Sequence, residues 1–414
     1  MKTLAEWLAF IERQHPRPVA LGLERVKQVL DRMQVRLECP VITVGGTNGK
    51  GSTCAMLESI LRAGGSRTGL YTSPHLVRYS ERVRIAGSEA EDQVLIDGFA
   101  AVERARGETP LTYFEFGTLA TFWVFAETKI ETAILEVGLG GRLDAVNVLD
   151  ADCAVLTSVD IDHVDYLGAD RESIGREKAG IFRPDRPAVV AEPDPPRSVL
   201  GAVGRKLLLG KDFGFTRQDG QWTYWGPKGK RAGLAHPALR GEVQLRNAAA
   251  ALCTLDALGL PVAMQDVRRG LAEVTLAARF QVLPGRPQVI LDVAHNVEAA
   301  KILADNLFNL GYASETIAVC GMLRDKDIAG VVRALAPRIT RWHLASVSGP
   351  RGATADDLRR HLGEAVAENF TSPRAAFEAA LKRAGEGDKI VVFGSFLTVG
   401  EAMAWLKNNK TSKR

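Results

Sequence analysis

Cysteine is scarce in this chain, and its placement excludes a cysteine-based scaffold. Five cysteines stand among 414 residues, at positions 39, 54, 153, 253 and 320, and no two form a Cys-x-x-Cys pair. A disulfide framework or a cysteine-ligated zinc site would need paired spacing. We therefore expect reduced thiols and a cytoplasmic protein.

Membrane and nucleic-acid signals are also missing. No apolar run approaches the length that crosses a bilayer. The first residues, Met1 to Trp7, include an early acid instead of the apolar segment of a signal peptide. The net charge of +4 is mild, and no block of Lys and Arg stands out. We expect small-molecule partners, no nucleic acid, no membrane and a monomer.

What is present is typical of a soluble α/β protein with more than one core. Apolar residues make up 46% of the chain and charged residues 25%, which is ordinary for a globular protein. The length and the alternation of strand and helix patterns predict two doubly wound, mostly parallel α/β domains. We place the first at residues 1–284, with a small antiparallel β region near 185–240. The second, smaller and Rossmann-like, spans 285–414.

A glycine-rich turn between an expected strand and an expected helix predicts a phosphate site. The strand begins at Val41, and glycines follow at positions 45, 46, 49 and 51. Such glycines let backbone N–H groups and a helix N-terminus approach a phosphate. Lys50 would add positive charge, and Ser52 or Thr53 a hydroxyl for Mg²⁺. The strict P-loop spacing is not met, because Val44 occupies its first glycine position and Gly51 directly follows the lysine. The alternative is a glycine turn without a ligand, which this combination of residues disfavours.

Polar residues end three further expected strands. Ser73 follows the strand at 67–71, Glu136 lies within the strand at 132–137, and His163 follows the strand at 153–159. Ligands of open α/β sheets bind at the carboxyl ends of the strands. A carboxylate in an apolar strand is costly to bury unless it is paired or bound to a cation, which favours Glu136 as a Mg²⁺ ligand. A plain turn at Ser73 and an ordinary surface His163 remain alternatives.

Two other polar residues have ordinary interpretations from spacing alone. Lys178 lies on an expected helix at 171–182, where helical spacing predicts a solvated surface lysine. Asn247 opens an alanine-rich helix at 245–258, which we expect to pack in the core. Between them, residues 184–239 have the alternation and turn pairs of short antiparallel strands, and we assign no chemistry there.

Taken together, these motifs resemble the folylpolyglutamate synthase/dihydrofolate synthase family of the Mur ligase superfamily, and most closely its bacterial bifunctional branch. The resemblance spans nearly the whole chain, with only residues 191–239 weakly marked. The matching stretches are Gly46-Thr-Asn-Gly-Lys-Gly-Ser52, Tyr71-Thr-Ser-Pro-His-Leu76, Leu111-Thr-Tyr-Phe-Glu115, Glu136-Val-Gly-Leu-Gly-Gly-Arg-Leu-Asp144, Asp162-His163, Arg171-Glu-Ser-Ile-Gly-Arg-Glu-Lys-Ala-Gly-Ile181, Asp292-Val-Ala-His-Asn296, Gly321-Met-Leu-Arg-Asp-Lys-Asp327 and Phe393-Gly-Ser395.

The resemblance implies an ATP-dependent amide ligase with a Mur-ligase-like ATPase domain and a C-terminal glutamate-ligase domain. A substrate carboxylate would take the γ-phosphate of ATP to form an acyl phosphate, and the amine of L-glutamate would then displace phosphate. The implied acceptors are dihydropteroate, which gives dihydrofolate, and the γ-carboxyl of reduced folates, which gives polyglutamates. Positioning and charge neutralisation dominate such phosphoryl transfer, so a glycine loop, a lysine and Mg²⁺ suit it.

The resemblance also implies roles for single residues around ATP and metal. The implied catalytic residues are Lys50, Lys178 and His163. The implied ATP contacts are Gly49, Lys50, Gly51, Ser52, Asn247, Arg279 and Asp292. The implied ligands of two Mg²⁺ ions are Ser73, Glu136, His163 and Lys178, the last as a carbamylated lysine, which replaces its interpretation as a surface residue. The implied pterin contacts are Thr112, Tyr113, Phe114, Glu115, Leu143, Asp144 and Ala145.

Three positions depart from the family pattern, and three other functions stay open. Val146 stands for a threonine, Ala278 for a glycine before Arg279, and Val297 for a proline that favours the first turn of a helix. Ala278 tolerates fewer backbone conformations than glycine, which bears on hinge flexibility. The alternatives are a cell-wall Mur ligase, a monofunctional folylpolyglutamate synthase, and an ATP-hydrolysing regulator or kinase that makes no amide.

Overall fold

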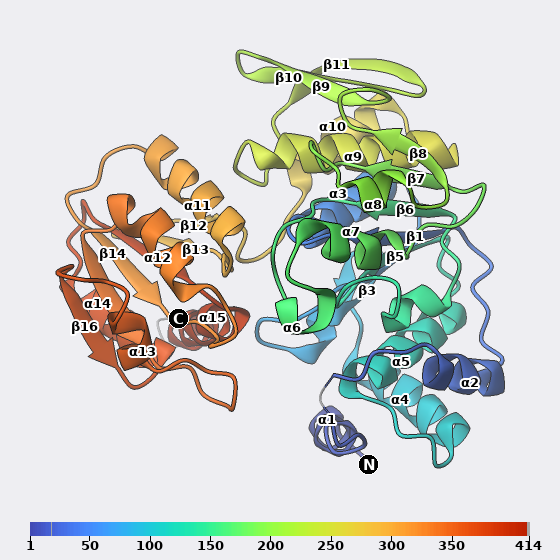
Figure 1. The fold of residues 1–414 in the computed structure, drawn as a ribbon, viewed down its shortest axis with the longest axis horizontal. Coiled ribbons are helices and arrows are strands. Elements are labelled where there is room, and N and C mark those ends of the chain that lie inside the picture. Colours follow the sequence, from blue (N-terminus) through green and yellow to red (C-terminus); the bar gives the residue numbers. More distant parts are fainter. Residues whose placement is uncertain (18, 412–414) are drawn as a thin grey trace. The chain divides into compact units, whose positions relative to one another are not determined.

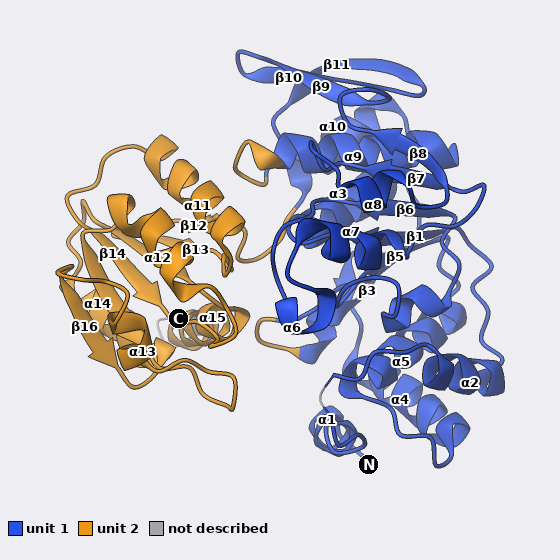
Figure 2. Ribbon diagram, in the orientation of Figure 1, with its two compact units in different colours: residues 1–75, 79–238, 244–274 blue, residues 76–78, 239–243, 275–414 orange. Residues whose placement is uncertain are grey.

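The computed structural model describes residues 1–17 and 19–411, which form two compact units (Figure 2). Unit 1 contains residues 1–75, 79–238 and 244–274, and unit 2 contains residues 76–78, 239–243 and the chain from Thr275 onward. Two short pieces from earlier in the chain therefore belong to the second unit. The division at residue 284 that the sequence suggests stays a prediction, and each unit is described by itself.

Unit 1 is built on an eight-stranded sheet (Figure 1), and its mostly parallel character is what the sequence predicts. Its order is β4-β3-β2-β5-β1-β6-β7-β8, and every neighbouring pair from β2 to β8 is parallel, whereas β3 and β4 are antiparallel. The central strands are buried on both faces, which explains their continuous apolar sequence. The strands are β1 Val41–Gly45, β2 Thr68–Tyr71, β3 Val83–Ile85, β4 Ser88–Glu89, β5 Thr132–Glu136, β6 Cys153–Leu156, β7 Pro187–Val190 and β8 Arg205–Leu208.

Helices pack on this sheet and against one another, and α1, α2, α4 and α5 lie together (Figure 1). The apolar character of α5 on all sides predicts a buried helix, and its phenylalanines at 116, 122 and 125 are fully buried. The helices are α1 Leu4–Ile11, α2 Glu24–Met33, α3 Lys50–Ala63, α4 Asp92–Arg106, α5 Tyr113–Glu127, α6 Val164–Leu167, α7 Arg171–Ala179, α8 Arg197–Leu200, α9 Val243–Leu258 and α10 Met264–Glu273, with the 3₁₀ turns η1 Tyr79–Arg82 and η2 Ala145–Val148.

The antiparallel region is smaller than the sequence predicts. Only β9 (Gly214–Gln218), β10 (Gln221–Gly226) and β11 (Gly229–Ala235) form the antiparallel sheet. The prediction was wrong for β7 and β8, which extend the parallel sheet, because the buried apolar β7 pairs with β6. Asp256 of α9 holds the small sheet, accepting hydrogen bonds from Tyr224 Oη at 2.8 Å and Arg231 Nη2 at 2.7 Å.

Unit 2 has a six-stranded sheet of order β12-β13-β17-β14-β15-β16, in which only β12 is antiparallel to its neighbour. The edge strands β12 and β16 are short and partly polar, so the sequence pattern did not reveal them. The strands are β12 Gln281–Leu283, β13 Gln288–Leu291, β14 Thr316–Cys320, β15 Arg341–Ala345, β16 Ala367–Phe370 and β17 Lys389–Phe393. The helices are α11 Val297–Asn309, α12 Ile328–Leu335, α13 Ala355–Arg359, α14 Pro373–Arg383 and α15 Phe396–Thr411, with the 3₁₀ turn η3 Ala336–Arg338.

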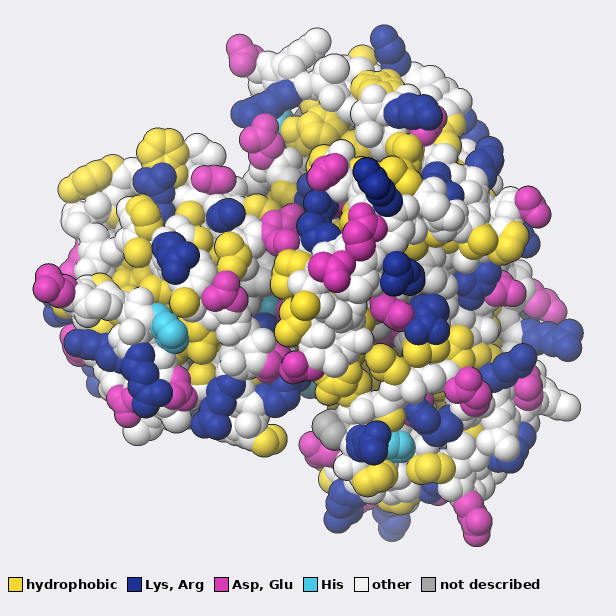
Figure 3. Space-filling model, in the orientation of Figure 1, with side chains coloured by type: hydrophobic (Ala, Val, Ile, Leu, Met, Phe, Trp, Pro, Cys, Tyr) yellow, Lys and Arg dark blue, Asp and Glu magenta, His cyan; other side chains and the backbone are white. Residues whose placement is uncertain are grey.

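The helices of the described residues and the face drawn in Figure 3 bear on membrane and nucleic-acid partners. No helix within residues 1–17 and 19–411 has both the length and the apolar character needed to cross a bilayer. On the face drawn in Figure 3, basic and acidic side chains are interspersed over both units. This view agrees with the mild net charge of +4.

Candidate active site

The carboxyl ends of four adjacent parallel strands bring the main sequence motifs of unit 1 to one edge. In the order β2, β5, β1, β6, these strands end before Ser73, at Glu136, at the glycine-rich loop, and before the segment that leads to His163. The backbone N–H of Ser73 donates to Oε2 of Glu136 at 3.1 Å, and Glu136 is only 5% exposed. The Ser73–Pro74 peptide is cis. The structure thus brings together the residues at the ends of β2 and β5 that the sequence singled out.

The glycine-rich loop is packed so closely that two of its glycines admit no side chain. Gly46 has a φ of 147°, and a Cβ there would lie 1.9 Å from Oγ1 of Thr157. Gly49 has a φ of 85°, and a Cβ there would lie 2.7 Å from Oδ1 of Asn247. Asn247 of α9 therefore lies next to the loop. A residue that contacts a ligand held by the loop must have such a position.

The effect of filling this space is testable at Gly46. Gly46→Ala should lower the affinity for adenine nucleotide at least roughly 10-fold and destabilise unit 1 by about 1–3 kcal/mol, because the new methyl group clashes and the backbone angle is unfavourable for alanine. Calorimetric ADP titration and thermal unfolding measure the two effects. The matched control is Gly65→Ala, whose φ of 89° is also positive but whose Cβ would meet nothing within 4 Å. Equal ADP affinity in both variants would contradict the assignment of this loop.

Two residues that the sequence analysis did not single out, Thr157 and Ser158, hold the loop, and Thr47 of the loop adds a third bond. Oγ1 of Thr157 donates to the carbonyl of Asn48 at 2.6 Å, and Oγ of Ser158 accepts from the N–H of Asn48 at 2.9 Å. Oγ1 of Thr47 donates to the carbonyl of Asp160 at 3.1 Å. A hydroxyl pair directly after a buried strand was the signal that could have identified them. These bonds fix the loop to the end of β6.

Lys50 lies at the first position of α3 and is anchored over the loop. Its Nζ donates to the carbonyls of Gly46 and Thr47, both at 3.0 Å. Ser52, two positions on, is 2% exposed, and the buried Oγ1 of Thr53 has no hydrogen-bond partner among the described residues. The loop thus has a cation and helix N–H groups beside it, and α3 adds a buried hydroxyl without a partner among the described residues. Such a donor set suits phosphate and its metal.

Lys178 is buried, so the surface position predicted from helical spacing was wrong. It lies on α7 with 5% exposure, because the loop after β5 covers this part of the helix. A Cβ on Gly141 of that loop would come within 2.8 Å of the carbonyl oxygens of Glu177 and Lys178. Burial, and next the charge of Lys50, lower the pKa of Lys178 to about 7. Its amine can therefore be neutral near neutral pH, which a surface lysine is not.

Acids share this electrostatic environment. Asp144 and Asp162 both act on the Lys178 amine in the direction that opposes its lowered pKa. Burial raises the pKa of Asp144 to about 7, although N–H groups of Leu139 and Val146 donate to its carboxylate and favour the charged form. The structure therefore places Lys50, Lys178, Asp144 and Asp162 close enough to influence one another.

His163 follows this acid and has strained backbone. Its φ is 52°, which is uncommon for a residue with a side chain, and its Nε2 lies 3.9 Å from Oδ2 of Asp162. No group of three His, Cys, Asp or Glu side chains within the described chain could hold a metal by itself. Of the predicted ligands only Glu136 and His163 are of these types. A cation there would thus need hydroxyl, carbamate or phosphate oxygens as well, which suit Mg²⁺.

Two of the predicted pterin contacts stabilise the N-terminus of α5. Thr112 and Glu115 form the capping box of α5, with bonds of 2.7 and 3.2 Å, and Arg25 pairs with Oε1 of Glu115 at 2.7 Å. The half-buried Tyr113 and Phe114 lie between them in sequence. The Phe114 ring packs where a Cβ on Gly138 would come within 2.6 Å. Their contact with a pterin stays a prediction.

The predicted segment from 143 to 145 leads into the turn η2. Asp144 is its N-cap, Ala145 is 4% exposed, and Leu143 is half-buried with its carbonyl accepting from the N–H of Gly22 at 3.4 Å. These residues, too, stay predicted pterin contacts.

In unit 2, Arg279 and Asp292 are neighbours. Asp292 accepts from the N–H groups of Phe280 at 2.7 Å and of Ala294 at 2.8 Å, and burial raises its pKa against the opposing effect of the Arg279 charge. The Arg279 guanidinium lies 5.2 Å from the Phe396 ring centre. Ala278 has a φ of 56°, so alanine occupies a backbone conformation that favours glycine.

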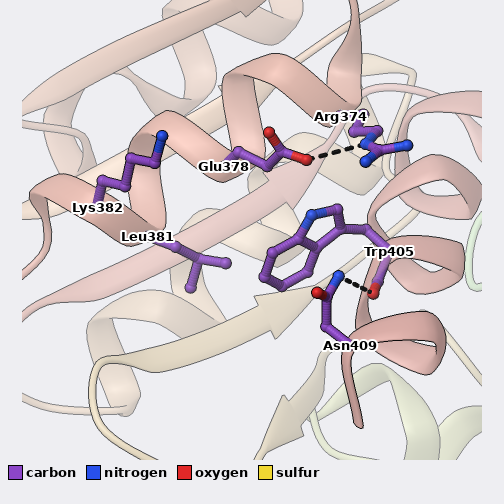
Figure 4. A pocket seen from close by; sticks show the side chains of 6 residues that line it. All are labelled: Arg374, Glu378, Leu381, Lys382, Trp405 and Asn409. Carbon is purple, nitrogen blue, oxygen red and sulfur yellow. Dashed lines mark hydrogen bonds and ion pairs between the residues drawn. The ribbon is translucent and has the colours of Figure 1, made fainter. Parts of the chain in front are cut away.

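Unit 2 also has an open groove of about 410 Å³ between α14 and α15 (Figure 4). Arg374 pairs with Glu378 at 2.9 Å on one side, and Asn409 bonds the Trp405 carbonyl on the other. None of the predicted site residues lines it, so the predicted chemistry lies elsewhere.

Comparison with known proteins identifies the family of this chain. The Mur ligase middle domain matches residues 44–255, and the Mur ligase glutamate ligase domain matches residues 278–396. The dihydrofolate synthase/folylpolyglutamate synthase of Escherichia coli (strain K12) is 46% identical over 97% of this chain and 94% of its own length.

Solved structures agree over the full length. Escherichia coli FolC in complex with DHPP and ADP superposes with a TM-score of 0.95 at 44% identity, covering 99% of each chain. A bifunctional folylpolyglutamate synthase/dihydrofolate synthase with Mn, AMPPNP and L-glutamate bound gives a TM-score of 0.92 at 45% identity, covering 98% of each chain. The fold expected from the sequence is thereby confirmed, and this chain belongs to the dihydrofolate synthase/folylpolyglutamate synthase family of Mur ligases.

Proposed function

We propose that this protein is a bifunctional, ATP-dependent ligase that adds L-glutamate to dihydropteroate and to the γ-carboxyl of reduced folates. Membership of the family supports the activity. The observation that carries it in the structure is the strand-end assembly of unit 1. There a closely packed glycine loop, the Ser73–Glu136 pair and two lysines with coupled charges occupy one sheet edge.

The loop and Lys50 would hold the phosphates of ATP. Backbone N–H groups of residues 49–52 open α3, and the lysine adds a cation that neutralises charge as the γ-phosphate leaves. The substrate carboxylate attacks that phosphate and forms an acyl phosphate with release of ADP. The glutamate amine then forms the amide and expels phosphate. Asn247, Arg279 and Asp292 stay proposed nucleotide contacts.

We propose that the site binds two Mg²⁺ ions. Ser73, Glu136 and His163 would hold one, and Lys178 would hold the other after its neutral amine adds CO₂ and loses a proton to give a carbamate. Bound Mg²⁺ would supply charge neutralisation for the phosphate oxygens. The buried position and lowered pKa of Lys178 fit this modification, since a charged amine does not react with CO₂.

Thr112 to Glu115 and Leu143 to Ala145 would bind the pterin-bearing acid. The half-buried rings of Tyr113 and Phe114 offer flat apolar surface of the kind on which a pterin stacks. We further propose that the protein acts as a cytoplasmic monomer.

A two-substrate assay tests the function. Phosphate release with ATP should require L-glutamate and should occur with dihydropteroate and with tetrahydrofolate. Turnover with tetrahydrofolate alone would indicate a monofunctional folylpolyglutamate synthase. Turnover only with a UDP-linked muramoyl substrate would indicate a cell-wall ligase, and glutamate-independent turnover a regulator or kinase.

A further inference from the structure

Arg82 is a buried arginine beside the predicted substrate segments. It ends η1, directly before β3, and is 9% exposed. Its guanidinium carbon lies 5.4 Å from the Tyr79 ring centre and 5.5 Å from that of Tyr113. Its Nε donates to Nδ1 of His75 at 2.8 Å. All four residues belong to unit 1.

No carboxylate among the described residues pairs with this guanidinium. Within residues 1–17 and 19–411, Arg82 has no carboxylate oxygen within ion-pair distance, and neither of its Nη nitrogens donates a hydrogen bond. His75 accepts as a ring nitrogen and brings no negative charge. Burying a cation is costly unless it is paired, and aromatic faces compensate only in part. Arg82 therefore has unused donors where the protein normally supplies a partner.

Other arginines with little exposure in unit 1 show the usual solution. Arg25 pairs with Glu115 at 2.7 Å, Arg84 with Glu58 at 3.0 Å, and Arg231 with Asp256 at 2.7 Å. Arg84 is only two residues beyond Arg82 on the same stretch of chain. The absence of a described carboxylate beside Arg82 is thus specific to this position, since comparable arginines of unit 1 are paired.

The unused nitrogens are accessible. The described residues include buried nitrogens that lack a partner, among them Nε of Arg25 and Nη1 of Arg231, but neither Nη of Arg82 is one of them. Neither Nη of Arg82 has a hydrogen-bond partner among the described residues, so each keeps some exposure at the molecular surface. These partly exposed nitrogens are the donors of Arg82 that an external anion would meet.

The position of Arg82 indicates which kind of anion would bind its guanidinium. Its carbonyl accepts from the N–H of Thr72 at 2.9 Å, so its backbone lies next to Ser73, whose N–H bonds Glu136. Its side chain lies against Tyr113, in the predicted pterin segment. A carboxylate attached to a pterin-bearing molecule that rests on Tyr113 would come within reach of this guanidinium.

We propose that the Nη groups of Arg82 bind a carboxylate of the pterin-bearing substrate, which makes Arg82 a substrate-binding residue of this enzyme. The inference rests on the proposed function. Arginine suits the role because its planar fork donates two parallel hydrogen bonds to a carboxylate. Two carboxylates have this chemistry. One is the reacting carboxylate, present in every acceptor, and the other is the non-reacting α-carboxylate, present only in acceptors that already contain glutamate.

Binding measurements without turnover test the contact. In Arg82→Met, which keeps length and apolar packing, we expect roughly a 10- to 100-fold loss of affinity for at least one of the carboxylated acceptors dihydropteroate and tetrahydrofolate. Affinity for 6-hydroxymethyl-7,8-dihydropterin, which has the ring but no carboxylate, should stay within about 2-fold. Arg82→Lys, which keeps the charge but loses the fork, should recover part of the loss.

Comparing the two acceptors shows whether Arg82 binds the reacting carboxylate or the α-carboxylate. Loss for both acceptors assigns the contact to the reacting carboxylate, and loss for tetrahydrofolate alone assigns it to the α-carboxylate. Unchanged affinity for both acceptors would overturn the proposal. An equal loss for the carboxylate-free pterin would also overturn it, because Arg82 would then act only by packing Tyr113.

The control is Arg106→Met. Arg106 also lies over an aromatic ring, at 5.8 Å from Phe10, but pairs with Glu103 and is none of the predicted site residues. Thermal unfolding of both variants separates loss of fold from loss of binding. Failure of the proposed function would appear differently, as absence of glutamate-dependent turnover in the unmodified protein whatever Arg82 does.

Discussion

Lys50→Ala should lower kcat by roughly 10²- to 10³-fold, the loss measured when one preorganised charge-stabilising group is removed from an active site. The expected defect is in turnover, because the lysine would act on charge that develops as the γ-phosphate transfers. Its Nζ is held by the carbonyls of Gly46 and Thr47, so the cation has a fixed position over the loop. Steady-state phosphate release with dihydropteroate, ATP and glutamate measures the effect.

The same variant should remain folded. Lys50 is half-buried, and water can replace its bonds to two loop carbonyls, so we expect a cost of about 1 kcal/mol in unfolding free energy. Lys27→Ala, at an exposed position of α2, is the matched control and should keep full activity. Turnover of Lys50→Ala equal to that of this control would refute the phosphate role.

Lys178→Ala should lose most activity and regain part of it with a small carboxylate such as acetate or formate. The physical reason is that the working group we propose is an anion, which a free carboxylate can imitate in the space left by the side chain. Activity titrated against acetate at constant ionic strength measures the rescue. An Ala variant with full activity and no response to acetate would show that the buried lysine is structural.

The unmodified enzyme gives a second measurement at this residue. Because burial brings the pKa of Lys178 to about 7, its amine is mostly charged at pH 6 and mostly neutral at pH 8. Only the neutral amine adds CO₂, so bicarbonate should activate CO₂-depleted enzyme more strongly at pH 8 than at pH 6. Carbon-13 NMR with labelled bicarbonate should show a carbamate signal that Lys178→Ala lacks.

Local pattern was sufficient where a residue's own strand or turn sets its surroundings. Glu136 stood out because an acid interrupts an apolar strand, and the structure buries it at the carboxyl end of β5. The glycine loop stood out because glycines and a lysine cluster between a strand pattern and a helix pattern. The close contacts of Gly46 and Gly49 show that a larger side chain would not fit there. These features are visible within a few residues of sequence.

Where another segment decides the environment, spacing failed. Lys178 is buried by the loop around Gly141, which lies 37 positions earlier, and helical periodicity contains no information about that contact. Only the family resemblance singled it out. Thr157 and Arg82 were missed for a related reason, because their partners, Asn48 and Tyr113, are distant in sequence. β7 and β8 likewise joined the main sheet through pairing that no local pattern encodes.

The attachment of the small β9–β11 sheet has a practical consequence. Asp256 accepts hydrogen bonds from both Tyr224 and Arg231, while the hairpin turns at Gly220 and Gly229 have open space where a Cβ would be. A fluorescent label or an affinity peptide inserted at either turn would extend into solvent and leave the anchoring carboxylate untouched. These turns are therefore suitable points for immobilising the enzyme or following its folding without altering the chemistry at the sheet edge.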